Sequence, residues 1–229
     1  MLIGGLQRSS LIDYPEKISA IVFTQGCNLR CGYCHNPELV QAKMFIRPLS
    51  EKKFFDFLKT RQGKLDAVTI TGGEPTLQSD LPEFIAKIKK LDFLVKLDTN
   101  GRDPRMLQGL LKKKLLDYIA MDIKAPLSKY EEVCGILAPV REIQQSISLI
   151  MKSGVDYEFR TTVVKGQLTP DDLLEIGKLI KNARLYILQK FEPSKTNDTE
   201  FMKRTTYSDE EFERVRRKLA KLVHACRVR

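Results

Sequence analysis

Tryptophan is absent from this chain of 229 residues, and histidine occurs only twice. No stretch approaches the roughly 18–20 consecutive apolar residues that a membrane-spanning helix needs, and no basic segment with a following apolar run resembles a signal peptide. We therefore expect a cytoplasmic protein with reduced thiols and no membrane association. Hydrophobic residues make up 42% of the chain, which suits one domain, residues 1–229, with a sizeable core.

Acidic residues are outnumbered, 29 against 39 lysines and arginines, so the net charge is +10. The basic residues are spread over several predicted helices and are densest in residues 214–229. No arginine-rich or aromatic-interleaved motif accompanies the charge, so we expect solvated helix faces and no nucleic-acid partner. A basic surface can also help to dock an acidic protein partner.

Cysteine is scarce as well, yet three of the five cysteines lie close together, with the spacing Cys-x3-Cys-x2-Cys at Cys27, Cys31 and Cys34. Thiolates so close along the chain can converge from one loop onto one metal centre. A [4Fe–4S] cluster normally takes four cysteine ligands, so three would leave one iron open for chemistry. Cys134 and Cys226 are isolated in the sequence, and we interpret them as buried or incidental thiols.

A structural zinc site is the alternative interpretation of the same loop, because His35 directly follows Cys34 and three cysteines with one histidine can bind zinc. Zinc sites usually space their ligands in two separated pairs, which this loop does not do. We therefore expect His35 to pack against the loop or the metal centre. His224, within a basic C-terminal segment, is expected to be exposed.

Six short apolar segments alternate with amphipathic ones along the chain. Near-continuous apolar runs are typical of parallel strands that are buried on both faces. Such alternation predicts an α/β fold with right-handed crossovers, and six units are too few for a complete eight-stranded barrel. We expect an incomplete (βα)6 TIM-like barrel that is open along one side, with a doubly wound sheet as the alternative. The predicted strands are 18–24, 67–71, 93–98, 118–123, 157–164 and 184–191.

Helix signals follow these strands. Asp80, Asp103 and Thr169 can each cap a helix that has proline in its first turn. Apolar residues within 140–151 recur on one helical face. Ser208 and Glu211 form a capping box that opens a basic helix over 208–226, outside a core of about 16–193. The polar stretch 194–207 predicts a mobile loop.

Polar residues stand where the predicted strands end. Because active sites of parallel α/β folds lie beyond the carboxyl ends of the strands, these residues should gather beside the cysteine loop, which follows the first strand. Each motif alone is typical of a turn or a helix cap, but their joint placement points to a site. The motifs are Gly72-Gly73-Glu74-Pro75, Asp98-Thr99-Asn100-Gly101, Asp122-Ile123-Lys124 and Arg160.

The loop Gln25-Gly26-Cys27-Asn28-Leu29-Arg30-Cys31-Gly32-Tyr33-Cys34-His35-Asn36-Pro37 resembles that of radical S-adenosylmethionine (SAM) enzymes, and more closely that of glycyl-radical enzyme activators. The upstream segment 6–15 is most similar to activating proteins of anaerobic ribonucleoside-triphosphate reductase. The resemblance extends from about residue 4 to the sixth strand, and it implies a radical SAM domain. The chain lacks the additional cysteine-rich insert of two-cluster activators, so a single cluster is expected.

The resemblance implies a role for each motif. Cys27, Cys31 and Cys34 would be the catalytic and metal-binding residues, each ligating one iron of a [4Fe–4S] cluster, while SAM would chelate the fourth iron. Its methionine amino group would lie against the glycine-rich motif, its adenosyl part against Tyr33 and Asn36, and its carboxylate against Lys124 or Arg160. The cofactor-binding residues implied in this way are Tyr33, Asn36, Gly72, Gly73, Glu74, Asp98, Thr99, Asn100, Asp122, Lys124 and Arg160.

Two details of the pocket remain open. Asp98 and Asp122 stand on adjacent strand ends, and we hypothesise that they share a small cation or the Lys124 ammonium, since bare carboxylates repel each other. Some relatives carry a histidine near the end of the sixth strand. This chain has none there, and Gln189 is the candidate replacement.

The implied activity is that of an oxidoreductase. Flavodoxin or ferredoxin would reduce the cluster, SAM would be cleaved to a 5′-deoxyadenosyl radical, and that radical would take hydrogen from a glycine Cα of anaerobic ribonucleotide reductase. The alternatives are an activator of pyruvate formate-lyase or of another glycyl-radical enzyme, and a small-molecule radical SAM enzyme such as a deazaguanine-type ring-forming synthase.

Overall fold

All strands of the computed structural model, which describes residues 1–137 and 140–229, belong to one sheet whose order follows the chain from β1 to β8. Neighbours from β2 onward are parallel, while β1 forms an antiparallel hairpin with β2. The strands are β1 (Ile3–Tyr14), β2 (Lys17–Thr24), β3 (Ala67–Gly72), β4 (Leu94–Thr99), β5 (Tyr118–Asp122), β6 (Asp156–Val163), β7 (Tyr186–Lys190) and β8 (Cys226–Val228).

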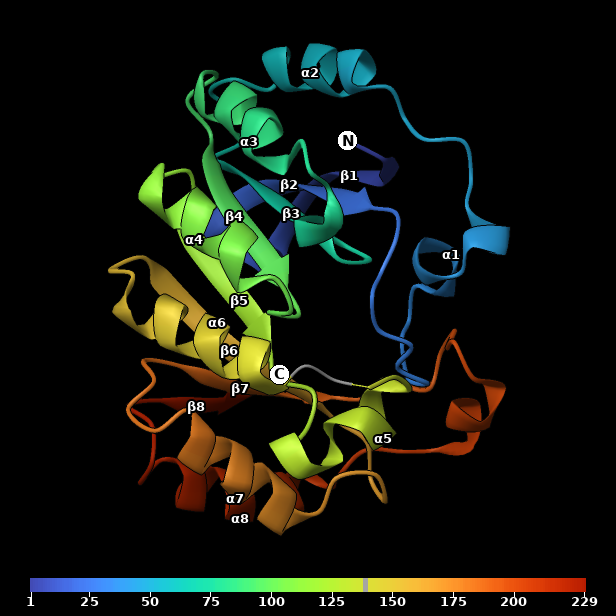
Figure 1. Cartoon of the computed structure of the whole chain (residues 1–229), viewed down its shortest axis with the longest axis vertical. Helices are drawn as coiled ribbons and strands as arrows, with labels where there is room; N and C mark the ends of the chain where they lie inside the picture. Colours follow the sequence, from blue (N-terminus) through green and yellow to red (C-terminus); the bar gives the residue numbers. More distant parts are fainter. Residues whose placement is uncertain (138–139) are drawn as a thin grey trace.

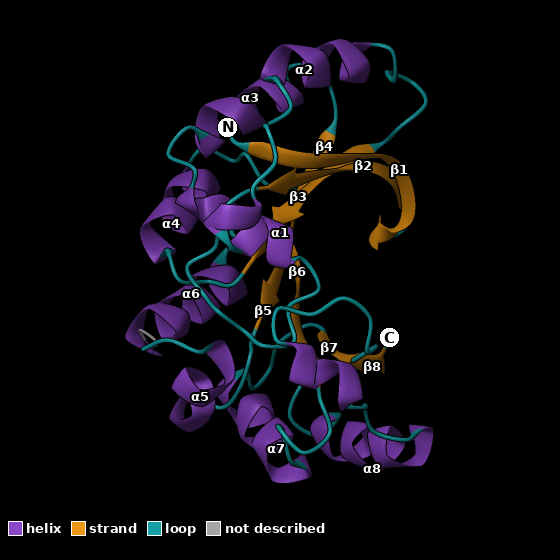
Figure 2. Cartoon of the chain, turned by 90° about the vertical axis from the view of Figure 1, so that its right-hand side faces the viewer, coloured by secondary structure: helices purple, strands orange, loops and turns teal. Residues whose placement is uncertain are grey.

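The edges β1 and β8 do not pair with each other within the described residues, so the curved sheet is an open barrel (Figure 2). The predicted incomplete barrel is confirmed, and its six strands correspond to β2–β7. Two further strands were missed. β1 does not alternate regularly, because its pairing with β2 shifts register three times, and β8 has only three residues.

Helices cover the outer face of the curved sheet (Figure 1). The longer helices bury an apolar face, as α3 does with Phe84, Ile85 and Ile88. Within the described residues no helix combines the length and the apolar character needed to span a bilayer. The α-helices are α1 (Pro37–Val40), α2 (Glu51–Lys59), α3 (Leu81–Lys89), α4 (Pro104–Lys112), α5 (Tyr130–Cys134), α6 (Val140–Lys152), α7 (Pro170–Leu179) and α8 (Asp209–Leu219), and the 3-10 helices are η1 (Ala42–Met44), η2 (Pro75–Leu77), η3 (Leu127–Lys129) and η4 (Thr199–Lys203).

Three of the four predicted helix caps are confirmed. Asp103 accepts from Met106 N at 2.9 Å, and capping boxes open α7 and α8. Asp80 occupies the N-cap position of α3, but its carboxylate makes no cap bond and instead pairs with the N-terminal ammonium group of Met1. The positively charged ammonium group of Met1 thus binds the Asp80 carboxylate in place of the backbone amides that Asp80 was predicted to cap.

The C-terminal helix ends at Leu219 and not at residue 226 as predicted. Residues 226–228 instead extend the sheet, where Cys226 pairs with Tyr186 of β7. The apolar pattern that predicts a helix continues beyond Leu219. The edge of β7, however, offers backbone hydrogen-bond partners to residues 226–228, so these residues form a strand and do not continue the helix.

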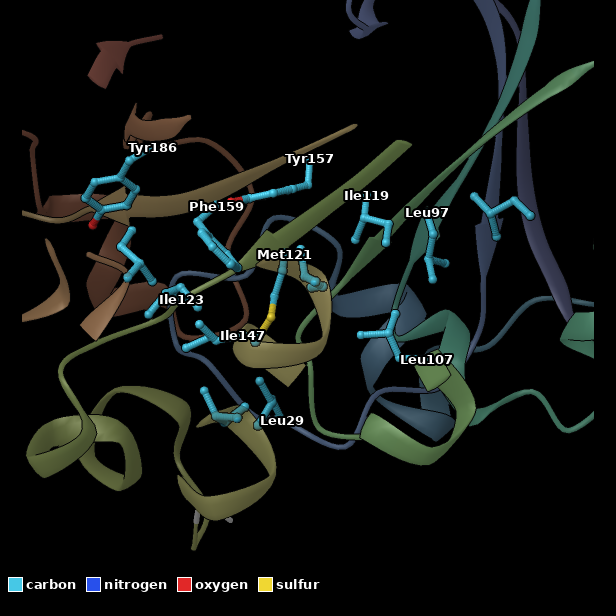
Figure 3. Packing of buried hydrophobic residues seen from close by; sticks show 14 of the residues in the cluster. Leu29, Leu97, Leu107, Ile119, Met121, Ile123, Ile147, Tyr157, Phe159 and Tyr186 are labelled. Atoms are coloured by element: carbon cyan, nitrogen blue, oxygen red, sulfur yellow. The ribbon is translucent and has the colours of Figure 1, made fainter. Parts of the chain in front are cut away.

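The core lies between the sheet and the helices, and the cysteine loop is anchored in it. Figure 3 shows Ile147 of α6 and Leu107 of α4 packed near Ile119 and Met121 of β5. Leu29, within the cysteine loop, belongs to the same cluster and is 2% exposed. Burying this leucine fixes one side of the loop to the rigid part of the fold.

Candidate active site

A cavity opens at the carboxyl ends of β2–β6, the edge where the sequence placed the site. It brings together the cysteine loop after β2, the glycine-rich turn after β3 and the polar ends of β4 and β5. Its lining comprises Cys27, Leu29, Cys31, Tyr33, Cys34, His35, Asn36, Val40, Thr71, Gly72, Gly73, Glu74, Asp98, Thr99, Asn100, Asp122, Lys124 and Thr162.

Hydrogen bonds hold the first half of the cysteine loop against three other parts of the fold. Gly26, with φ +97°, donates from its amide to Leu39 O at 2.8 Å, so the loop returns to α1. Arg30 N donates to Cys134 O at 2.7 Å, which joins the middle of the loop to α5. Asn28 Oδ1 accepts from Asn100 Nδ2 at 2.8 Å, and this bond ties the loop to the end of β4.

The three thiols differ in their acidity. Burial raises the pKa of Cys27 to about 12 and also raises that of Cys34. The neighbouring Cys134 thiol and the Lys124 ammonium lower the pKa of Cys31 against the effect of burial. Because iron binds thiolates, loading the site must release protons from Cys27 and Cys34.

The arrangement of donors suits a cluster better than a single ion. Within the described residues no three His, Cys, Asp or Glu side chains converge closely enough to hold one metal ion. Tetrahedral zinc, with Zn–S bonds of about 2.3 Å, would draw its ligands together. Three thiols that instead surround a cavity fit the larger [4Fe–4S] group, whose irons each take a separate cysteine.

His35 packs against the segment that follows β7. Its Nε2 lies 2.9 Å from Glu192 O, and its ring stacks on Phe191 at 5.5 Å between centroids. His35 thus packs as a side chain, as predicted, but its partners Phe191 and Glu192 follow β7 and do not belong to the cysteine loop.

The glycine-rich turn approaches the cysteine loop so closely that side chains are excluded. A Cβ on Gly73 would lie 2.0 Å from Gly26 O, and a Cβ on Gly72, which has φ +119°, would lie 2.3 Å from Thr24 N. Glu74 N donates to Gly26 O at 2.7 Å. Glycine at both positions therefore lets the ends of β2 and β3 meet at the cavity wall.

The buried Glu74 carboxylate organises this wall. It accepts from Thr76 N at 3.1 Å, Thr76 Oγ1 at 2.6 Å, Thr99 Oγ1 at 2.7 Å and Asn100 N at 2.7 Å. Three of these bonds end on Oε1 and one on Oε2, so both oxygens of the carboxylate are held. Burial raises the pKa of Glu74, while the four donors oppose that rise. The side chain thus joins the turn after β3 to the end of β4 at the cavity wall.

Charged residues of β4–β6 form an alternating chain beside the cavity. Lys96 pairs with Asp98, Arg160 bonds Asp98 at 3.0 Å and Asp122 at 2.8 Å, and Lys124 Nζ bonds Asp122 at 2.9 Å. The Lys124 ammonium also lies 5.9 Å from the centroid of the Tyr33 ring. Of the two cations proposed for a ligand carboxylate, Lys124 lines the cavity, whereas Arg160 is taken up by the two aspartates.

Every predicted site residue except Arg160 lines the cavity. The sequence analysis missed Thr71 and Thr162, although each had a signal. Thr71 directly precedes the glycine-rich turn, and Thr162 lies two residues after Arg160 on β6, on the same strand face. Gln189, the candidate replacement for a histidine, is not part of the lining.

The chain is similar in sequence to known proteins. Residues 21–180 match the model of the "Radical SAM superfamily". A Methanocaldococcus jannaschii protein whose assigned role is that of a glycyl-radical enzyme activating enzyme is 40% identical over 88% of this chain and 85% of its own length. The pyruvate formate-lyase-activating enzyme of Clostridium pasteurianum is 36% identical over 80% of this chain and 77% of its own length.

Solved structures agree on the fold. SuiB of Streptococcus suis, bound to S-adenosylmethionine, superimposes with a TM-score of 0.68 at 16% identity over 89% of this chain. The chain spans about half of that longer protein, 48% of its length.

Proposed function

The chain belongs to the radical SAM superfamily and, within it, to the family of glycyl-radical enzyme activating enzymes, and we propose that it forms a glycyl radical on a partner enzyme. Members of the superfamily use a [4Fe–4S] cluster and S-adenosylmethionine. The observation that carries the proposal is the cavity itself, where three thiols of one loop face the glycine-rich turn and the Lys124 ammonium.

Different residues of this cavity bind the cluster and the two charged groups of SAM. In this proposal Cys27, Cys31 and Cys34 hold the cluster, and the backbone carbonyls of Gly72 and Gly73 accept from the amino group of SAM. Lys124 pairs with its carboxylate, since an ammonium of this kind has room for a second anionic partner besides Asp122.

The remaining lining orients the adenosyl part. Tyr33 and Asn36 lie in the same loop as the thiols, so one segment of chain positions both the cluster and the nucleoside. Asp98, Thr99, Asn100 and Asp122 complete the wall. Bound together, the two cofactors supply a 5′-deoxyadenosyl radical that removes hydrogen from the glycine Cα of the partner.

The partner that we propose is anaerobic ribonucleoside-triphosphate reductase, on the strength of residues 6–15. The similarity to a pyruvate formate-lyase-activating enzyme makes that lyase the second candidate. In this proposal the glycine-bearing loop approaches the cavity from the open side of the barrel, between β1 and β8. Flavodoxin or ferredoxin is the proposed electron donor.

Electron paramagnetic resonance tests the proposal. The reconstituted, reduced protein is mixed without oxygen with SAM and either purified partner enzyme. We expect a glycyl-radical doublet on one partner and stoichiometric 5′-deoxyadenosine, with neither product from a Cys31→Ala variant. Cleavage of SAM that leaves no radical on either partner, or on another glycyl-radical enzyme, would reject the activase function in favour of small-molecule chemistry.

A further inference from the structure

The segment after β7 packs directly on the cysteine loop. We call residues 191–203 the brace. In Figure 1 it is the orange chain that lies next to the turn of the blue cysteine loop. The sequence predicts a mobile polar loop here, but the structure shows η4 and a series of contacts with residues 32–41.

Polar contacts run along the brace. Asp198 N donates to Gly32 O at 2.9 Å, and Gln41 Nε2 donates to Asn197 Oδ1 at 2.6 Å. Lys195 forms an ion pair with Glu38 at 2.6 Å. These bonds, with the hydrogen bond between His35 and Glu192 O, join residues 32–41 to a segment more than 150 residues away in sequence.

The apolar centre of the brace is Phe201, which is 6% exposed although its neighbour Met202 is 46% exposed. The Phe201 ring lies against the Cα of Gly32, where an added Cβ would approach Cε2 to 2.3 Å. The ring centroids of Tyr33 and Phe191 are 6.2 Å and 6.4 Å away. Phe201 thus fills the space that a side chain at position 32 would take.

We propose that Phe201 is a positioning residue for the cluster. Its ring holds the turn from Cys31 to Cys34 in the geometry that ligates iron, and it keeps water and oxygen away from the cluster. Gly32 stands between two of the three ligands, so displacing its backbone moves both. Groups that support metal ligands affect metal retention almost as much as the ligands do. The inference depends on the cluster and not on the partner enzyme, so a failure of the activase proposal leaves it intact.

The test compares Phe201→Ala with Phe212→Ala in the reconstituted protein. Phe212 of α8 is also buried, at 1% exposed, and makes no contact with the cysteine loop, so it controls for the stability that any such truncation removes. We expect Phe201→Ala to lose its cluster absorbance near 400 nm about tenfold faster in air than the wild type, and Phe212→Ala to match the wild type. Equal rates in the two variants would overturn the proposal.

Two further variants keep the test decisive. Phe201→Leu, which refills part of the space, should fold even if the alanine variant does not and should lose its cluster at an intermediate rate. Met202→Ala should behave as the wild type, because this side chain is exposed on the same short helix.

A double-mutant cycle tests the contact itself. Gly32→Ala alone should speed cluster loss and shift the midpoint potential, because the added Cβ collides with the Phe201 ring. In the Phe201→Ala background the same change should add little, since the ring is gone. Additive effects on cluster loss would show that the two residues do not act through one contact, and would reject the proposed role of Phe201.

Discussion

The guanidinium of Arg160 holds Asp122 through Nε at 2.8 Å and also reaches Asp98 at 3.0 Å through Nη1. Of the two partners hypothesised for these carboxylates, a small cation or the Lys124 ammonium, the second is wrong. Among the described residues Lys124 pairs with Asp122 and not with Asp98, and the side chain that bridges the two carboxylates is Arg160. The guanidinium fork suits this position, since it can offer separate N–H groups to two acceptors. The repulsion expected between the Asp98 and Asp122 carboxylates is thus offset by the guanidinium of Arg160 on the neighbouring strand β6.

Asp122→Asn should destabilise the folded protein by about 3 kcal/mol, because removing one partner leaves Arg160 and Lys124 buried without their shared anion. Urea unfolding of the apo protein at pH 7 measures the loss. Asp56→Asn is the control, since Asp56 makes an exposed ion pair with Lys52 and should change stability little. A near-neutral Asp122→Asn would show that the network contributes nothing to the fold.

The same network predicts how stability depends on pH. Burial alone would raise the pKa of Asp122, but the charges of Arg160 and Lys124 outweigh it and hold that pKa well below its ordinary value of 3.8. A carboxylate with a depressed pKa stabilises the fold fully above its unfolded pKa and loses that contribution progressively as the pH falls from the unfolded value through the folded value. The difference between wild type and Asp122→Asn should stay constant from pH 7 to about 5 and shrink below about 4. A difference that already declines near neutrality would contradict this.

Glu74→Gln should weaken both the fold and cofactor binding. An amide presents one acceptor oxygen and one NH2 group, so at least one of the donors Thr76, Thr99 and Asn100 would face another donor. The loss should be about 1–3 kcal/mol in urea unfolding, as for a buried unpaired polar group. Glu83→Gln on the exposed face of α3 provides the control for the same change of charge.

Lys124→Met should raise the Kd for SAM about tenfold, in line with the loss of a hydrogen bond to a charged group. Anaerobic equilibrium dialysis against the cluster-loaded protein measures it, with Lys129→Met as the control because its ammonium pairs with Asp172 outside the cavity. Decarboxylated SAM separates the roles of the residue. It should bind the variant and the wild type equally, and an unequal result would place Lys124 against another part of the cofactor.

Much of the site follows from the sequence because its residues directly follow buried strands. The apolar runs that end at Thr24, Thr71 and Asp98 fix which motifs share one edge of the sheet. The brace could not be predicted in the same way. Its residues 194–199 have no periodic pattern, and the contact of Phe201 with Gly32 depends on how β7 directs the chain back across the cysteine loop. Pairings such as that of Arg160 with two aspartates likewise require the side-chain geometry of three neighbouring strands.

Cys134 poses the last question, because the sequence shows it as isolated while the fold brings it against Cys31. The Cys134 carbonyl accepts from Arg30 N at 2.7 Å, so a backbone hydrogen bond joins α5 to the cysteine loop. The Cys134 thiol takes no part in that bond and can interact with the Cys31 sulfur. If Cys134 only donates to that sulfur, Cys134→Ala should retain the iron and sulfide content of the wild type, whereas Cys31→Ala should lose the cluster.

The Cys134 thiol should still affect the reduction potential of the cluster, since hydrogen bonds to cluster sulfurs change that potential. The midpoint potential of Cys134→Ala should fall relative to the wild type while that of Cys226→Ala, a buried thiol on β8, should not. Loss of iron from Cys134→Ala would instead make it a fourth ligand, and the open iron that the proposed chemistry needs would be gone.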